Sequence, residues 1–352
     1  MREVPSKEHY SKEPEKIEIA ERRELKSLLR GPNGEVPELS VAIAEDGAAR
    51  RVNFWDIDKT VLWAHDVHFE TITKIFPEAA AKNTEDLQHT YEAGWRLGNS
   101  YREWDRMHRI FSEGQNQYRD PAIYRSEFIE NEDMRRKIDE ENHPEGWHER
   151  AAEILARYDV EGSAVLRKMY VDGKIDDNFL IPSMVHLLKA KARLGEINTF
   201  LTANPRGVAN GLLTYTGLYK YGFAVASDEN FVGGGKEVGI KHLIELIEAQ
   251  GITVPKHRLV VLGDSERGDI GSGHKLMKQG DYTFEGVLVR KDMAESEIFK
   301  KAAESDPYLQ EMLKDMEITI VSSENVPTKD GQFKLGRLGS SNAARGQENS
   351  ES

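Results

Sequence analysis

The clearest hydrophobic pattern in the chain is a mainly apolar run at 52–55, which predicts a strand of a parallel sheet that is buried on both faces. This run leads directly into two carboxylates, Asp56 and Asp58, followed by Thr60. The carboxyl ends of the strands form the ligand crevice of an open α/β sheet. A buried charge without a partner costs free energy, so these acids could hold a cation and a phosphate there. The same residues also fit a strand that leaves the core into a solvated turn.

Short strand patterns recur along the chain and alternate with helical patterns after residue 181. We expect strands at 39–44, 197–201, 221–226, 258–262, 284–289 and 318–321, and helices at 184–194, 207–218, 238–249 and 295–314. This alternation predicts an α/β fold, a doubly wound and mostly parallel sheet with a Rossmann-like arrangement of layers.

Residues 65–180 have a different pattern, with helical periodicity, few β-branched runs and frequent Glu, Arg and Lys. Helices are expected at 69–81, 84–97, 101–113, 121–140 and 146–158. The stretch reads as a separate helical module inserted after the first strand end. Basic and aromatic residues such as Arg96, Arg102 and Trp104 are interleaved in it, which fits either contact with an anionic ligand or packing between helices.

These patterns divide the chain into four parts. They are an N-terminal extension at 1–38, a core at 39–66 and 181–327, an inserted all-helical domain at 67–180 and a largely disordered tail at 328–352. Within the extension, Leu25, Leu28 and Leu29 lie at helical spacing before a Gly-Pro turn, which predicts one amphipathic helix. The tail is rich in Gly, Ser, Asn, Gln and Glu, a composition typical of disorder.

Length and composition are those of a globular protein, because 352 residues with 38% hydrophobic content can form one large or two ordinary domains. The formal net charge of -13 argues against non-specific binding to nucleic acid or to an anionic membrane, since both are negative. Cysteine is absent, which excludes disulfides and thiolate metal ligands. The N-terminus is polar, and no run of about eighteen apolar residues is present. We therefore expect a soluble, cytoplasmic protein with neither a membrane nor a nucleic-acid partner.

Polar residues also stand at the ends of two later strands. The strand after the helical stretch ends on Thr202, and the most strand-like run of the chain leads into Asp264 and Asp269. Between them, a glycine-rich loop delivers Lys236 to the start of a helix. Each feature alone has an ordinary explanation as a solvated turn or helix start, but successive strand ends of this kind predict one shared site.

Together these residues resemble the four motifs of the haloacid dehalogenase-like (HAD) hydrolase superfamily. In chain order the motif residues are Asp56-Ile57-Asp58-Lys59-Thr60-Val61, then Thr202, then Lys236, then Gly263-Asp264 with Asp269. The resemblance covers about residues 50–66 and 181–290, and the stretch 67–180 resembles the cap that many members insert after the first motif. It implies a Rossmann-like core with a helical cap and a phosphatase type of activity.

The resemblance implies a role for each motif residue. Asp56 would attack phosphorus and carry the phosphoryl group as an aspartyl-phosphate, while Asp58 would protonate the leaving oxygen and later activate water. Lys236 and the Thr202 hydroxyl would neutralise and orient the phosphoryl oxygens as charge builds on them. The presence of Asp58 argues against a phosphonatase or a dehalogenase, whose patterns in this superfamily lack that second acid.

The resemblance also implies a magnesium site. Two carboxylates cannot both stay ionised beside a phosphate without a counter-charge, and a hard dication prefers oxygen ligands. The ligands would be Asp56, the main-chain carbonyl of Asp58, and Asp264, with Asp269 holding a metal-bound water or the outer shell. Mg2+ is the expected ion.

Three features depart from the family pattern or compete with it. Lys59 stands where many members have glycine. Lys241 is a second candidate for the third-motif lysine, and Lys236 is preferred because it follows the glycine loop at the helix start. His65, Asp66 and His68 are spaced like a metal cluster, although a surface position explains such a pattern more often.

The expected function is a magnesium-dependent phosphomonoester hydrolase whose partner is a phosphorylated small-molecule substrate, for example a nucleotide or a sugar phosphate. Two alternatives stay open. One is a phosphotransferase or mutase of the same superfamily, in which an acceptor hydroxyl replaces water. The other is a non-catalytic member that binds a phosphorylated ligand, and the filled motif positions argue against it.

Overall fold

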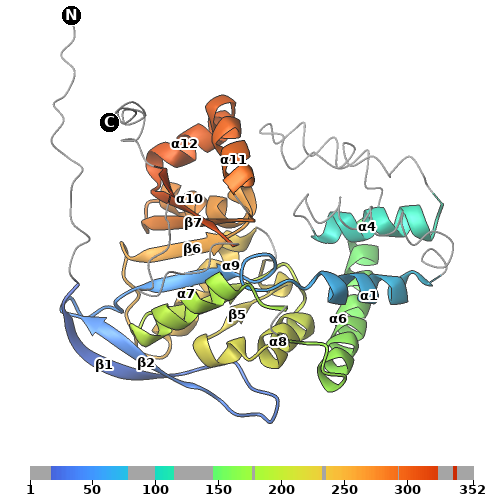
Figure 1. Cartoon of the computed structure of the whole chain (residues 1–352), viewed down its shortest axis with the longest axis horizontal. Helices are drawn as coiled ribbons and strands as arrows, with labels where there is room; N and C mark the ends of the chain where they lie inside the picture. Colours follow the sequence, from blue (N-terminus) through green and yellow to red (C-terminus); the bar gives the residue numbers. More distant parts are fainter. Residues whose placement is uncertain are drawn as a thin grey trace, which may run out of the picture.

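The structure is a computed structural model, and it describes residues 17–77, 100–114, 146–176, 179–231, 235–291, 293–323 and 336–338. Its centre is a sheet with the strand order β5-β4-β3-β6-β7-β8-β9 (Figure 1). The strands are β3 (Val52–Asp56), β4 (Ile197–Leu201), β5 (Val225–Ala226), β6 (Leu259–Gly263), β7 (Phe284–Arg290), β8 (Ile318–Ser322) and β9 (Gly336–Leu338). The β8–β9 pair is antiparallel, and the other pairs of this sheet are parallel.

The register of the central strands determines which residues meet at the carboxyl edge. β3 lies between β4 and β6, with Trp55 level with Phe200 on one side and Leu262 on the other. Asp56 is level with Leu201 on β4. The residues that leave all three strands therefore emerge side by side at one edge of the sheet.

Helices cover both faces of the sheet, as the two hydrophobic clusters show (Figure 1). One face carries α7 (Pro182–Arg193) and α8 (Arg206–Tyr215), and the other carries α9 (Lys236–Glu248), α10 (Gly271–Lys278), α11 (Met293–Ser305) and α12 (Pro307–Asp315). Neighbouring residues of a strand point to opposite faces, so Trp55 packs in the first cluster and Phe54 in the second. The expected doubly wound α/β fold with a mostly parallel sheet is confirmed.

The described part of the helical stretch lies to one side of the sheet in Figure 1. It consists of α1 (His65–Ile75), α4 (Ser100–Phe111) and α6 (Trp147–Val171), which confirm the helices expected at 69–81, 101–113 and 146–158 with shifted ends. The helices expected at 84–97 and 121–140 lie outside the described residues.

These helices share a hydrophobic cluster with the core. Val67 on α1 and Leu155 on α6 belong to the same buried cluster as Trp55 on the central strand and Val208 on α8. The described helical segment therefore continues one face of the core, and the domain boundaries remain a prediction.

The N-terminal segment differs from its prediction. Leu25 lies in strand β1 (Ile19–Lys26), which pairs antiparallel with β2 (Glu38–Ala44), so the helix expected around Leu25, Leu28 and Leu29 is wrong. Leu25 and Leu29 are buried, whereas Leu28 is 48% exposed. This alternation has a period of two, which is the period of an extended chain. Pairing with β2 therefore overrides the helical spacing of the three leucines.

Two other elements are shorter than expected. The strand expected at 221–226 is limited to β5, because the 3-10 helix η4 (Leu218–Tyr221) precedes it, and η5 (Asp228–Phe231) follows. The helix expected at 295–314 is split into α11 and α12 by Asp306-Pro307. Pro307 disfavours helical geometry at the residue before it, Asp306. The Asp306 carboxylate instead accepts hydrogen bonds from the first backbone N–H groups of α12.

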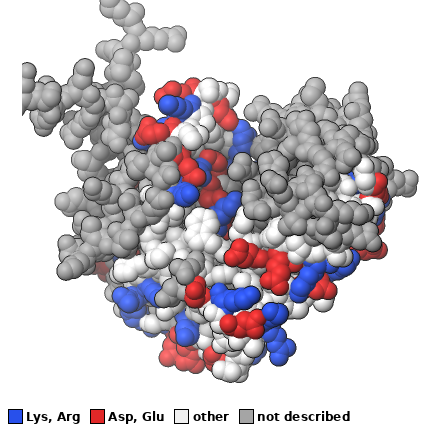
Figure 2. Space-filling model, turned by 45° about the vertical axis from the view of Figure 1, so that its right-hand side comes forward, with Lys and Arg blue, Asp and Glu red and all other residues white. Residues whose placement is uncertain are grey.

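Part of the tail is also ordered by pairing. Within 328–352, β9 forms backbone hydrogen bonds with β8 and is the last strand of the sheet on that side, and the rest of the tail lies outside the described residues. None of the described helices combines the length and the apolar composition needed to cross a membrane. Acidic and basic side chains are interspersed over the face shown in Figure 2.

Candidate active site

Asp56 is the last residue of the central strand, and its carboxylate is held by two donors. Lys236 Nζ donates to Oδ1 at 2.5 Å, and Thr60 Oγ1 donates to Oδ2 at 3.1 Å. The side chain is buried. Burial and the negative charge of Asp269 raise the pKa of Asp56 well above its usual range, although Lys236 opposes this. Lys236 alone therefore does not fully stabilise the ionised form of Asp56.

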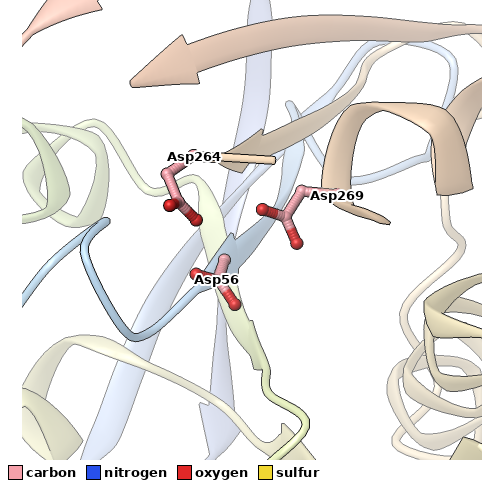
Figure 3. Close-up of side chains that lie close together, drawn as sticks. All are labelled: Asp56, Asp264 and Asp269. Carbon is pink, nitrogen blue, oxygen red and sulfur yellow. The ribbon is translucent and has the colours of Figure 1, made fainter. Parts of the chain in front are cut away.

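Three carboxylates meet at the carboxyl edge of the sheet (Figure 3). Asp56, Asp264 and Asp269 each offer an oxygen, and these oxygens lie within 4.8 Å of one another. They come from the ends of β3 and β6 and from the π-helical turn η6 (Glu266–Ile270). Burial, with the charge of Asp269 added, raises the pKa of Asp264 to about 7. Asp56 and Asp264 are thus both destabilised as anions until another cation is present.

The predicted lysine of the third motif reaches this cluster. Lys236 is the first residue of α9, and its Nζ donates to Asp56 Oδ1 at 2.5 Å and to Asp269 Oδ1 at 2.6 Å. Burial by itself would lower the pKa of Lys236, but the charges of Asp269 and Asp56 outweigh burial and raise it. The competing Lys241 lies one turn further along the helix, where its Nζ donates to Gln279 on the surface. The geometry therefore favours Lys236.

Asp58 lies in a different environment from Asp56. Its Oδ1 is 3.1 Å from His68 Nε2, and its Oδ2 accepts a hydrogen bond from Asn204 Nδ2 at 2.5 Å. His68 belongs to α1 of the helical segment, and its Nδ1 contacts the hydroxyl of Tyr158 on α6. Side chains from α1 and from the segment after β4 thus hold this carboxylate, and α6 supports it through His68.

The direction of this chain of contacts follows from Asp58. An ionised carboxylate only accepts hydrogen bonds, so the ring nitrogen that faces it, Nε2 of His68, carries a proton. In the neutral ring Nδ1 is then an acceptor for the hydroxyl of Tyr158, whose pKa is raised well above its usual range by burial and by the charge of Asp58. Both oxygens of Asp58 then accept hydrogen bonds, and the carboxylate is fixed in orientation.

Thr202 follows β4 and is connected to the same network. Its Oγ1 accepts hydrogen bonds from the backbone N–H of Asn204 at 3.1 Å and from Asn204 Nδ2 at 3.0 Å. The hydroxyl proton of Thr202 is therefore available for a further acceptor, such as a phosphoryl oxygen.

The loop that carries Asp264 and Asp269 is held by two contacts. Arg290, at the end of β7, donates to the main-chain oxygen of Asp264 and forms an ion pair with Glu266. Asp269 Oδ2 accepts a hydrogen bond from the backbone N–H of Ser265 at 2.9 Å. These contacts fix the loop next to the end of β3.

The donor set fits a hard dication. All three carboxylates supply oxygen, which is the ligand type that Mg2+ prefers. Both oxygens of Asp269 already accept hydrogen bonds, from Lys236 and Ser265, which suits an outer position. Both side-chain oxygens of Asp58 are likewise engaged, whereas among the described residues no backbone N–H donates to its carbonyl oxygen. The arrangement is therefore compatible with Asp56, Asp264 and the Asp58 carbonyl as direct ligands.

Sequence reasoning missed the residues around Asp58. Asn204 lies two residues after Thr202, and Tyr158 carries no local signal, because only the packing of α6 on α1 brings it near. The sequence favoured a surface position for His68 over a metal cluster, and the surface position is wrong, because His68 is buried. Among the described residues, the three aspartates are the group that meets metal-ligand geometry. Arg96, Arg102 and Trp104, for which packing between helices and contact with an anionic ligand both stay open, lie outside the residues whose side chains are described.

Comparison with known proteins gave distant structural likenesses. No protein-family model matches the chain, and no curated protein sequence matches it. A beta-phosphoglucomutase from Clostridium difficile is 13% identical with a TM-score of 0.41, and the match covers 74% of this chain and 96% of that chain. YfnB from Bacillus subtilis, named as a HAD-hydrolase and bound to magnesium, is 15% identical with a TM-score of 0.40 and coverages of 69% and 90%. CbbY from Rhodobacter sphaeroides, in complex with xylulose-(1,5)bisphosphate, is 14% identical with a TM-score of 0.40 and coverages of 68% and 86%.

At this level of similarity, the chemistry of the site follows from its own residues. The order of those residues along the chain and their meeting at the carboxyl edge of an α/β sheet resemble the HAD-like hydrolases.

Proposed function

We propose that the protein is a magnesium-dependent phosphomonoester hydrolase that acts through an aspartyl-phosphate intermediate on Asp56. The observation that carries this proposal is the contrast between two carboxylates two residues apart. Asp56 lies against Lys236 and the metal-ligand cluster, whereas Asp58 is held by His68 and Asn204. Carboxylates with different surroundings suit different roles, one as nucleophile and one as acid and base.

In the first step, a carboxylate oxygen of Asp56 forms a bond to phosphorus while the bond from phosphorus to the ester oxygen breaks. The leaving oxygen takes a proton from Asp58 and departs as an alcohol. Lys236 contacts Asp56, and Thr202 is connected to Asp58 through Asn204. They supply a positive charge and a hydroxyl donor for the phosphoryl oxygens.

In the second step, water attacks phosphorus of the aspartyl-phosphate. Asp58, now ionised, takes the proton from that water, and the bond to Asp56 breaks to release inorganic phosphate. The hydrogen bonds from His68 and Asn204 orient Asp58 for both proton transfers. Over the two steps, one phosphate monoester and one water molecule are converted into one alcohol and one inorganic phosphate.

The carboxylates of Asp56 and Asp264, with the main-chain carbonyl of Asp58, would hold the magnesium ion. When bound, the ion neutralises charge on the phosphoryl oxygens and keeps the nucleophile and the phosphate together. The raised pKa of Asp56 and the pKa of about 7 for Asp264 support this role, because burial and the charge of Asp269 raise both values and a bound dication would stabilise the ionised carboxylates.

The test is a screen of phosphorylated metabolites, nucleotides and sugar phosphates with the purified protein and magnesium. Magnesium-dependent release of inorganic phosphate from at least one ester would support the proposal. Transfer of the phosphoryl group to a second hydroxyl without phosphate release would identify a phosphotransferase or mutase instead. Binding without any turnover of the bound esters would identify a non-catalytic phospho-ligand binder.

A further inference from the structure

Lys59 has a backbone conformation that a lysine rarely adopts. Its φ angle is 58°, and it is the one non-glycine residue with positive φ among the described residues. The left-handed region brings Cβ close to the following carbonyl, so glycine is the residue that accepts it without cost. Backbone strain of this kind is concentrated at functional sites, where the neighbouring structure maintains it.

The surrounding loop imposes this conformation. The Lys59 N–H donates to the carbonyl of Leu62 at 2.8 Å, and the N–H of Val61 donates to the carbonyl of Ile57 at 3.0 Å. The next residue, Thr60, donates its hydroxyl to the Asp56 carboxylate. Lys59 is therefore fixed in the turn that connects the two site acids, where glycine would satisfy the backbone equally well.

The charge of Lys59 acts on the site without being neutralised. Lys59 follows Asp58 directly, and its positive charge lowers the pKa of Asp264, opposing the effect of burial and of Asp269 on that carboxyl. Among the described residues no carboxylate forms an ion pair with Lys59, whereas Lys236 is engaged by two. The side chain is half-buried. Lys59 thus offers a positive charge that the carboxylates have not already paired.

Such a charge has a specific use in this site. In the first step Asp58 carries the proton for the leaving group, so Lys236 and a bound dication together only balance the three carboxylates of Asp56, Asp264 and Asp269. None of that positive charge is left over for an entering phosphate dianion, which therefore needs a further cation.

We propose that Lys59 is a second phosphate-binding cation, which attracts the phosphate of the substrate into this acidic site at the cost of weaker magnesium binding. The inference rests on the proposed function, since it assumes that phosphate and magnesium bind here. It predicts effects of opposite sign on the two ligands, because one positive charge attracts an anion and repels a cation. A residue that only supports the loop would affect both in the same direction.

The test is Lys59→Met, which keeps a long side chain and removes the charge, compared with Lys59→Arg, which keeps the charge. Lys241→Met, on the exposed face of α9, is the control for loss of one positive charge. Calorimetry would measure magnesium binding alone and then inorganic phosphate binding at saturating magnesium. We expect Lys59→Met to weaken phosphate binding about tenfold and to strengthen magnesium binding about threefold. Lys59→Arg and Lys241→Met should stay close to the wild type.

Two further results separate failure of this inference from failure of the proposed function. If the wild type binds both ligands and Lys59→Met leaves both constants unchanged, or weakens both, the inference is overturned and the proposed function stands. If the wild type binds neither ligand, both are overturned. Lys59→Gly accepts the left-handed conformation without strain, so it gives the same charge test if Lys59→Met folds poorly.

Discussion

Nε2 of His68, on the first helix of the inserted segment, lies 3.1 Å from Oδ1 of Asp58, at the end of the central strand. Ten residues separate them in the sequence, and the chain leaves the sheet between them. The helical segment that shares a hydrophobic cluster with the core therefore also orients the carboxylate to which we assign proton transfer.

His68→Ala should slow the reaction most where the leaving group needs a proton. Loss of the donor to Asp58 should reduce turnover of an alkyl phosphate about ten- to a hundredfold, and turnover of an aryl phosphate with an acidic phenol much less. Steady-state kinetics on both esters measures the difference. In the Asp58→Asn background, the same substitution should cost little more, because its target is already lost. Equal losses on both esters would instead indicate general damage to the fold.

Removal of magnesium should abolish activity. Chelator should stop phosphate release, magnesium should restore it, and calcium should inhibit, because its larger and more flexible coordination sphere suits in-line transfer poorly. Asp264→Asn should raise the magnesium concentration needed for half-maximal activity at least about tenfold. Asp281→Asn, an exposed acid before β7, is the matched control and should change nothing. Full activity in chelator would remove the metal from the mechanism.

The two lysines of α9 should differ strongly. Lys236→Met should reduce turnover about a hundredfold or more, since its Nζ lies 2.5 Å from the proposed nucleophile. Lys241→Met should have almost no effect, because Lys241 Nζ donates to the surface residue Gln279. Comparison of the turnover numbers of the two variants tests which lysine belongs to the site. A larger loss in Lys241→Met than in Lys236→Met would show that the third motif has been assigned to the wrong lysine.

A buried ion pair far from the site should contribute acid-sensitive stability. Burial would raise the pKa of Glu196, but the charge and hydrogen bond of Lys191, at 3.0 Å, and the amide of Asn53 outweigh burial and lower it. A carboxyl whose pKa is lower in the folded state than in the unfolded state stabilises the fold at pH values above the unfolded pKa, here 4.5. This contribution is lost as the pH falls through the folded-state pKa.

Glu196→Gln should therefore lower the free energy of unfolding at pH 7 by about 1–3 kcal/mol and flatten its decline below about pH 4.5. Denaturant melts at a series of pH values measure both effects. Glu285→Gln removes a more exposed pair with Arg51, so it should cost little and serves as control. An unchanged acid dependence in Glu196→Gln would refute the assignment.

The sequence predicted the parts of this molecule that depend on local pattern. Strand ends such as Asp56, Thr202 and Asp264 could be located because apolar runs stop there, and parallel strands bring their carboxyl ends together. The contacts around Asp58 could not be predicted from the sequence. Tyr158 and His68 belong to two helices, and tertiary packing decides which sides of those helices face each other. The prediction of an N-terminal helix was wrong for the same reason, because pairing of β1 with β2 overrides the helical spacing of three leucines.

The central claim is that Asp56 carries the phosphoryl group, and the most direct test uses the Asp58→Asn variant. With an aryl phosphate whose leaving group needs no proton, this variant should form the aspartyl-phosphate but hydrolyse it slowly, because the base is missing. Rapid acid quench followed by mass spectrometry of peptides would locate the phosphoryl group. We predict one phosphoryl group on the peptide that contains Asp56, and none when Asp56→Asn is added. A phosphoryl group on another residue, or phosphate release by Asp56→Asn at the wild-type rate, would contradict the account.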